Sequence, residues 1–128
     1  MAYEIPDLLV TFVAGADESS NQFCFMKLDS SGNVVITSGV TDKPIGVLQN
    51  APTSGGGASV MLEGISKVIA GGDLAPGDLV GTDGSGHAVK YSPGTDTTKY
   101  IVGTALATAA SGDITSIAID CKAPHRAA

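Results

Sequence analysis

The sequence has few aromatic side chains and no tryptophan. Its 128 residues include three Tyr and three Phe, so the apolar interior must be built from Val, Ile, Leu and Ala. A core of that kind leaves no large aromatic-lined pocket of the sort that holds many small ligands. A carbohydrate- or ligand-binding β-module within a larger assembly therefore stays an alternative function, and the poverty of aromatic residues argues against it.

Positive charge is also scarce. Seven Lys and Arg stand against thirteen Asp and Glu, which gives a formal net charge of −6. Nucleic-acid-binding domains carry a basic patch or stripe, so the sequence predicts no nucleic-acid partner and no binding to an anionic membrane. No apolar run approaches the roughly 18 residues of a membrane span, and the start of the chain lacks the basic segment of a secretory signal. Synthesis in the cytoplasm is expected.

Cysteine and histidine are each present only twice. Cys24 and Cys121 are far apart; a disulfide between them is one interpretation, and two buried free thiols are favoured over it. His87 and His125 lack the paired spacing of zinc ligands, and both are expected to be exposed. No serine lies in a nucleophile-elbow pattern. We therefore predict that the chain is not an enzyme and holds no cofactor.

Several aspartates lie next to glycines, as in calcium-binding loops. Calcium needs about six to eight oxygen ligands from closely spaced acidic residues, whereas these aspartates are isolated, one to a turn. Aspartate in that position usually hydrogen-bonds to the backbone of its own turn. The sequence therefore favours turns over a metal site at Asp73, Asp78, Asp83 and Asp113.

Glycine is abundant, with 17 residues distributed between short apolar runs. This pattern is typical of many turns and short strands, and no convincing amphipathic helix interrupts it. A chain of this length is expected to form one domain, residues 1–128. We predict an all-β fold, a small single-domain β-barrel or sandwich of short antiparallel strands. The expected strands cover residues 22–28, 34–37, 44–49, 60–64, 64–69, 79–82, 87–91, 100–106 and 114–120, followed by a loose tail at 122–128.

The segment 64–80 carries the most specific local pattern. A β-branched run is followed by two glycines, and the sequence Ala75 to Asp78 suits a type II turn, with proline at its second position and glycine at its third. Leu74 is expected to reach back into the core as a plug. We predict that this turn is structural and not a chemical site; its residues are Gly71, Gly72, Pro76, Gly77 and Asp78.

The first sixteen residues allow two interpretations. The run Leu8–Val13 is continuously apolar, as expected of an ordinary core strand, which is the favoured interpretation, or of an extended N-terminal arm that adds to a neighbour. The two are compatible if only the first residues reach outwards. The candidate contact residues of such an arm are Tyr3, Glu4, Ile5 and Pro6.

A weak internal similarity links two parts of the chain. The segment Ile45–Leu48, followed by a small-residue loop, Val60 and Leu62, resembles the segment 102–106 with its own loop, Ile117 and Ile119. The two units are about 57 residues apart. This similarity suits a barrel closed by two equivalent hairpins.

Taken in order, four segments resemble one known family: Pro44–Leu48, Gly64–Ile69, Leu74–Val80, and Val102–Leu106 continued by 112–119. That order, over roughly residues 40–120, is similar to the small capsid cement, or head decoration, proteins of tailed bacteriophages. The resemblance implies a compact β fold that binds the outside of the mature head as a homotrimer and locks neighbouring copies of the major capsid protein together. It also implies that the N-terminal segment, here about residues 1–13, touches the shell. The role implied is binding without turnover, on the exterior of the virion.

Overall fold

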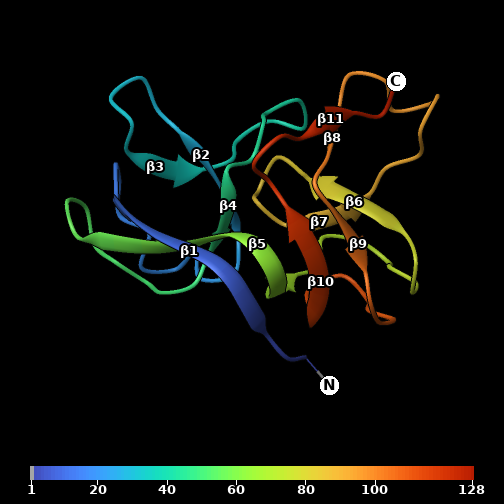
Figure 1. The fold of residues 1–128 in the computed structure, drawn as a ribbon, viewed down its shortest axis with the longest axis horizontal. Helices are drawn as coiled ribbons and strands as arrows, with labels where there is room; N and C mark the ends of the chain where they lie inside the picture. Colours follow the sequence, from blue (N-terminus) through green and yellow to red (C-terminus); the bar gives the residue numbers. More distant parts are fainter. Residues whose placement is uncertain (1) are drawn as a thin grey trace.

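Nine strands form one curled antiparallel sheet, and two more form a small separate sheet (Figure 1). The structure, a computed structural model, describes residues 2–128, and no helix occurs among them. The all-β prediction is confirmed. The strands are β1 Ile5–Val13, β2 Phe25–Leu28, β3 Val34–Ile36, β4 Gly46–Leu48, β5 Gly57–Ile69, β6 Leu79–Thr82, β7 Ala88–Lys90, β8 Tyr100–Ile101, β9 Gly103–Ala105, β10 Ile114–Asp120 and β11 His125–Arg126.

The long strand β5 is the axis of the sheet, whose order is β3-β2-β4-β5-β10-β9-β6-β7. On one edge, β5 pairs with β4 at residues 60–61 and with β10 at residues 63–69. On its other edge, residues 57–65 pair with β1. The sheet curls into a half-barrel with one lobe on each side of β5 (Figure 1). Because one strand spans residues 57–69, the two strands expected between residues 60 and 69 are in fact continuous.

Gly64 is the point at which β5 passes from one lobe to the other. It has a φ of +132°, and a β-carbon there would lie 2.6 Å from the carbonyl oxygen of Ile5. The pairing of β1 with β5 is irregular just beside it, with register shifts between Pro6 and Leu9. Only glycine combines this backbone angle with so close an approach of the neighbouring strand.

The two lobes are built from the same structural unit. The turns of the hairpins β2–β3 and β6–β7 each begin with an aspartate, Asp29 or Asp83, and each contains a glycine at φ +80° or +79°. The same hydrogen bonds fix both turns: one carboxylate oxygen accepts the N–H groups of Ser31 (2.9 Å) and Asn33 (3.0 Å) in the first, and of Ser85 (2.8 Å) and His87 (2.9 Å) in the second.

The equivalence extends to the strand that enters each unit. Ala14, just after β1, forms a parallel bridge to Val34, and Ala70, just after β5, forms one to Ala88. The glycine that follows each alanine donates its N–H to the bridged residue's carbonyl oxygen at 2.8 Å in both units. The matching positions are 54 to 57 residues apart along the chain. In the segments of the expected internal similarity, β4 pairs with β5 as β9 pairs with β10, each matching residue 57 positions further on. The internal similarity is therefore present in the structure, where β5 closes the first unit and opens the second.

Two apolar clusters hold the sheet in this shape, one on each face of β2, β4 and β5. Phe25, Val47 and Met61 face a cluster shared with the second lobe, while their neighbours Met26, Leu48 and Val60 face a cluster within the first. This separation follows from the two-residue period of a strand. Apolar residues on both faces of these three strands therefore connect the two lobes into one core.

The C-terminal residues depart from the expectation. The loose tail predicted at 122–128 is wrong, because His125 and Arg126 form β11 and pair with β8. Ala127 is buried, donates its N–H to the carbonyl of Lys99 at 2.9 Å and accepts the N–H of Gly94 at 2.8 Å. A pairing of two strands of two residues each leaves little hydrophobic pattern in the sequence. The prediction of a tail therefore depended on composition alone.

Candidate binding surface

Strand β1 and the residues just before it carry a large share of the big apolar side chains that the fold leaves exposed. Val10 and Phe12 pack against the core of the first lobe, whereas Leu9 and Val13, on the opposite face, are each 48 % exposed. Among residues 2–128, five of the nine large apolar side chains that remain exposed lie between residues 3 and 13: Tyr3, Ile5, Leu8, Leu9 and Val13. The expectation of an ordinary core strand is therefore wrong for the outward half of this run, which is apolar and open to solvent.

The backbone of β1 is also open along one edge. Within residues 2–128, β5 is the strand that pairs with β1, and none pairs with its other side. An unprotected edge with apolar side chains is a template for adding another strand, and monomeric proteins usually blunt such edges. The sequence signal for this surface was the continuous apolar run itself, which does not say which face is buried.

The four predicted contact residues are all exposed: Tyr3 and Glu4 precede β1, and Ile5 and Pro6 begin it. Tyr3 is nevertheless anchored: its N–H donates to Ser116 Oγ at 2.7 Å, and the Ser116 hydroxyl donates to the Tyr3 carbonyl at 2.8 Å. Glu4 approaches Lys67 at 4.0 Å. Ile5 and Pro6 are opposite Ile65 and Gly64 of β5. The segment thus lies against the sheet, with its side chains directed outwards.

The turn at residues 71–78 lies between β5 and β6. Gly77 has a φ of +90°, the Asp78 N–H donates to the Ala75 carbonyl at 3.1 Å, and the Asp78 carboxylate accepts the Ala75 N–H at 2.9 Å. Leu74 is buried and exchanges two backbone hydrogen bonds with Ala109. Gly71 and Gly72 have ordinary backbone angles, so the close packing of Asp83, His87 and Val89, and not the dihedral angles, is what requires glycine at position 71.

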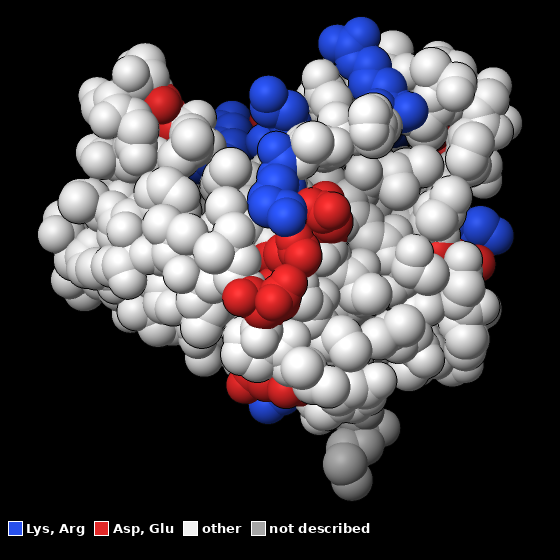
Figure 2. Space-filling view, in the orientation of Figure 1, with Lys and Arg blue, Asp and Glu red and all other residues white. Residues whose placement is uncertain are grey.

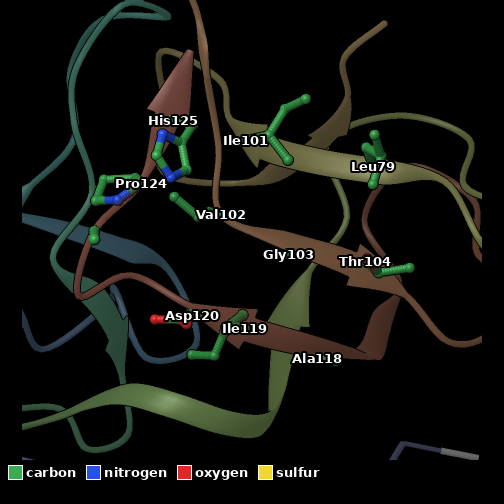
Figure 3. Close-up of a pocket in the computed structure, with 11 residues that line it drawn as sticks. Leu79, Ile101, Val102, Gly103, Thr104, Ala118, Ile119, Asp120, Pro124 and His125 are labelled. Atoms are coloured by element: carbon green, nitrogen blue, oxygen red, sulfur yellow. The ribbon is translucent and has the colours of Figure 1, made fainter. Parts of the chain in front are cut away.

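The histidines do not meet a nucleophile. His125 is exposed and, with Asp120, lines a cavity of about 480 Å³ between the β9–β10 pair and the β8–β11 pair (Figure 3). The wall of that cavity is otherwise mostly aliphatic and contains no serine or cysteine. His87 is half-buried in its turn, so the expectation that it is exposed is wrong. This arrangement provides a shallow apolar hollow and no charge-relay geometry.

The two cysteines are free thiols, buried in the core and poorly reactive. Cys24 and Cys121 lie in different core clusters and are not joined. Burial, together with the weaker effect of neighbouring acidic charges, raises the pKa of Cys24 to about 11 and that of Cys121 to about 12. Because the thiolate is the reactive form, neither thiol is suited to nucleophilic chemistry at neutral pH.

Three of the four aspartates predicted to serve turns do so, and Asp73 is the exception, since no hydrogen bond of its side chain occurs within the described residues. The carboxylates of Asp78, Asp83 and Asp113 each accept backbone N–H groups of their own turns. Among residues 2–128, no group of three or more acidic, His or Cys side chains lies close enough together to hold a metal ion. In the same range, no helix is long and apolar enough to cross a membrane.

Charge is unevenly distributed on the molecular surface. In Figure 2 a group of Lys and Arg side chains lies on the upper part of the visible face, above a stripe of acidic side chains, and others lie beside acidic side chains at the right edge and at the bottom. Three of the seven cations, Lys27, Lys43 and Lys122, line one cavity of about 430 Å³. These lysines are scattered in the sequence and form no motif, so only the fold brings them together.

Comparison with known proteins identifies the family. The sequence profile of the phage cement proteins matches residues 11–120. The chain belongs to the phage cement protein family. It is therefore a structural protein associated with the phage capsid, and the family resemblance stated from the sequence is confirmed.

The fold of this phage cement protein also has a solved counterpart. The crystal structure of the head fiber gp8.5 N base of bacteriophage phi29 superposes with a TM-score of 0.64 at 23 % identity, over 88 % of this chain and 95 % of that one. At this identity the likeness shows a shared fold. No curated protein sequence matches the chain.

Proposed function

We propose that this protein binds the outer surface of the mature capsid as a homotrimer and stabilises the shell by bridging neighbouring copies of the major capsid protein. The observation that carries the proposal is the surface of β1, which has apolar side chains on its outer face and one edge with no partner strand within residues 2–128. The family membership supports a partner in the capsid, and β1 supplies a surface of the kind that a partner covers.

The chemistry of β1 suits protein–protein contact. Its free backbone N–H and C=O groups can continue a sheet across an interface, which supplies affinity, while Ile5, Leu9 and Val13 supply apolar burial and register. Completely burying one such side chain is worth about 1.5–3 kcal/mol. Three copies in a trimer present the surface three times, so each trimer engages several sites at once.

Stabilisation then follows from linkage. A protein that binds the expanded, assembled lattice and not its dissociated subunits lowers the free energy of the lattice by RT ln(1 + [L]/Kd) at each site. These contributions are small individually, and a shell repeats them over its whole surface. The net charge of −6 supports an exterior position, because a lining that faces packaged DNA would be expected to be basic.

Two measurements test the proposal. Light scattering on the purified protein should give the mass of a trimer, and cosedimentation should show binding to expanded heads and little binding to unexpanded heads. A protein that is monomeric and sediments with neither kind of head would contradict both parts. Synthesis in the host cytoplasm followed by addition to the finished head is the route that this proposal requires.

A further inference from the structure

One cavity contains cations and no carboxylate. It has a volume of about 430 Å³ and lies where the segment that precedes β4 meets the segment that follows β10. Its wall contains Lys27, Lys43 and Lys122, together with the apolar side chains of Leu28, Ile45 and Pro124. In a chain with thirteen acidic residues and seven basic ones, a wall with three cations and no acid is a distinct chemical environment.

Two of the three lysines are held in place from outside the cavity. Lys27 Nζ donates to Asp42 Oδ2 at 2.9 Å and to Ser38 Oγ at 3.1 Å. Lys122 pairs with Glu63. Neither carboxylate belongs to the cavity wall, so each positions its lysine while leaving the cavity side free of negative charge.

Hydrogen bonds favour the charged form of one member of each ion pair. Burial alone would raise the pKa of Asp42, but the hydrogen bonds from Lys27 and from the amides of Ser38 and Gly39 outweigh it and lower the pKa below 3.8. The hydrogen bond to Glu63, followed by its charge, raises the pKa of Lys122 above 10.5. Both shifts favour the charged form, so the Asp42 carboxylate and the Lys122 ammonium group are ionised at neutral pH.

The third lysine has no such partner. Lys43 is exposed, and within the described residues it has no carboxylate oxygen within 4.0 Å. The Lys43 ammonium group lies beside two other ammonium groups, which repel it. Binding an anion from another molecule therefore lowers the electrostatic energy of this cluster, because opposite charges in contact attract. The cavity thus has one unneutralised cation beside two preorganised ones.

We infer that this cavity binds an acidic, extended peptide segment of the partner, with a carboxylate against Lys43 and Lys122 and an adjacent apolar side chain against Leu28, Ile45 and Pro124. The size agrees, because about 300–1,000 Å³ is typical of sites for small ligands or a few side chains. A nucleic-acid strand fits less well, because the acidic remainder of the surface would repel a long polyanion. Identifying the partner as the capsid shell rests on the proposed function; the acidic-peptide chemistry does not.

A peptide titration tests the cavity itself. The probe is an acetylated, amidated hexapeptide of alternating glutamate and leucine, and its control replaces each glutamate with glutamine. Followed by amide NMR shifts, the acidic peptide should perturb residues around Lys27, Lys43 and Lys122, and the control peptide should bind at least about fivefold more weakly. The affinity should also fall as salt is raised, since exposed charges are screened over about 10 Å at 0.1 M.

Matched variants separate this site from general charge. Lys43→Glu should weaken binding of the acidic peptide by about fivefold or more. Lys90→Glu makes the same charge change on β7, outside the cavity lining, and should leave binding unchanged. Equal effects of the two variants, shifts that map elsewhere, or tighter binding of a short single-stranded DNA at the same residues would overturn the inference.

The same variants link the cavity to the capsid. Lys43→Glu should cosediment with expanded heads less well than Lys90→Glu does. Equal sedimentation of both variants would remove the cavity from capsid binding while leaving the cement function standing. Failure of the wild-type protein to sediment with heads would contradict the proposed function instead, and the peptide titration would still decide what the cavity binds.

Discussion

Thr37 Oγ1 lies 2.5 Å from Thr82 Oγ1, and both threonines are buried. Thr37 follows β3, at one end of the sheet order, and Thr82 ends β6, near the other. Each hydroxyl also has a backbone carbonyl acceptor, that of Phe25 at 3.4 Å from Thr37 Oγ1 and that of Asp83 at 2.8 Å from Thr82 Oγ1. One side-chain hydrogen bond thus connects the two ends of the half-barrel.

Removing this hydrogen bond should destabilise the fold. We expect Thr37→Val to lower the free energy of unfolding by about 1–2 kcal/mol, since it removes a buried hydrogen bond while keeping the side-chain shape. The double variant Thr37→Val/Thr82→Val should cost less than the sum of the two single changes, because both remove the same interaction. Urea unfolding gives these values, and additive costs would show that the two hydroxyls are not coupled.

A control is available at Thr108, which is exposed in a loop. Thr108→Val should change the free energy of unfolding by no more than about 0.5 kcal/mol. A cost at Thr108 comparable to that at Thr37 would point to the threonine substitution itself and not to the closure of the sheet.

Much of this architecture could be predicted because turns leave strong local signals. Glycine and aspartate at fixed offsets, as in Asp29–Asn33 and Asp83–His87, located both equivalent hairpins. The continuity of β5 was not predicted, because Gly64 looks like the end of a strand in sequence and is a bend within one in the structure. Local pattern predicts that a turn or break occurs, whereas long-range pairing decides whether the strand continues through it.

The functional surfaces were harder to predict, for a physical reason. The sequence of a strand that is apolar on both faces is the same whether its outer face is covered by the protein's own core or by another protein. For this reason Leu8–Val13 supported two interpretations. The cationic cavity had no signal at all, since Lys27, Lys43 and Lys122 come from distant segments. Binding surfaces of this kind depend on tertiary structure and not on motifs.

The two adjacent glycines shortly after β5, Gly71 and Gly72, provide a second prediction. A β-carbon at Gly71 would lie 2.9 Å from His87 Cβ and 3.0 Å from Val89 Cγ1, whereas one at Gly72 would meet only Val89 Cγ1, at 4.0 Å. We expect Gly71→Ala to cost about 1–3 kcal/mol by overpacking. Gly72→Ala, the adjacent control, should stay within about 0.5 kcal/mol of the wild type. Thermal or urea unfolding of the pair measures the difference, and equal costs would refute the packing argument.

The buried thiols predict slow labelling and a loss of stability at alkaline pH. The unfolded thiol titrates near pH 9, and the folded values of about 11 for Cys24 and about 12 for Cys121 are higher. Their contribution is therefore complete below pH 9 and is lost as pH rises towards 12. Tyr91 adds to the same range, because burial raises its pKa to about 12. The urea concentration at the unfolding midpoint should therefore be lower at pH 10.5 than at pH 8.

Thiol reactivity gives an independent measure of the same burial. At pH 8 a disulfide reagent should label the native protein only at the rate of unfolding, and should label both cysteines at once in guanidinium. Cys121→Ala should reduce the alkaline slope of the urea midpoint, although it also leaves a small cavity. Rapid labelling of the native protein, or a midpoint that is flat with pH, would contradict the assigned burial.

The outward side chains of β1 provide the prediction closest to function. Leu9→Ser should leave the free energy of unfolding nearly unchanged, because Leu9 is 48 % exposed and faces away from the core. It should weaken association, of the trimer or with the head, by about 1–2 kcal/mol through lost apolar burial. Ile114→Ser is the matched control, because Ile114 is 50 % exposed at the start of β10 and not on β1.

Deleting residues 1–6 extends this test to the start of β1. The deletion removes the two Tyr3–Ser116 hydrogen bonds and the pairs of Ile5 and Pro6, but keeps the register from Leu8 to Val13. The shortened protein should therefore fold and bind heads more weakly, as cosedimentation would measure. Equally tight binding by the shortened protein would show that residues 1–6 take no part in the contact with the head. The contribution of β1 would then come from residues at or after Asp7, and Leu9→Ser should still weaken binding.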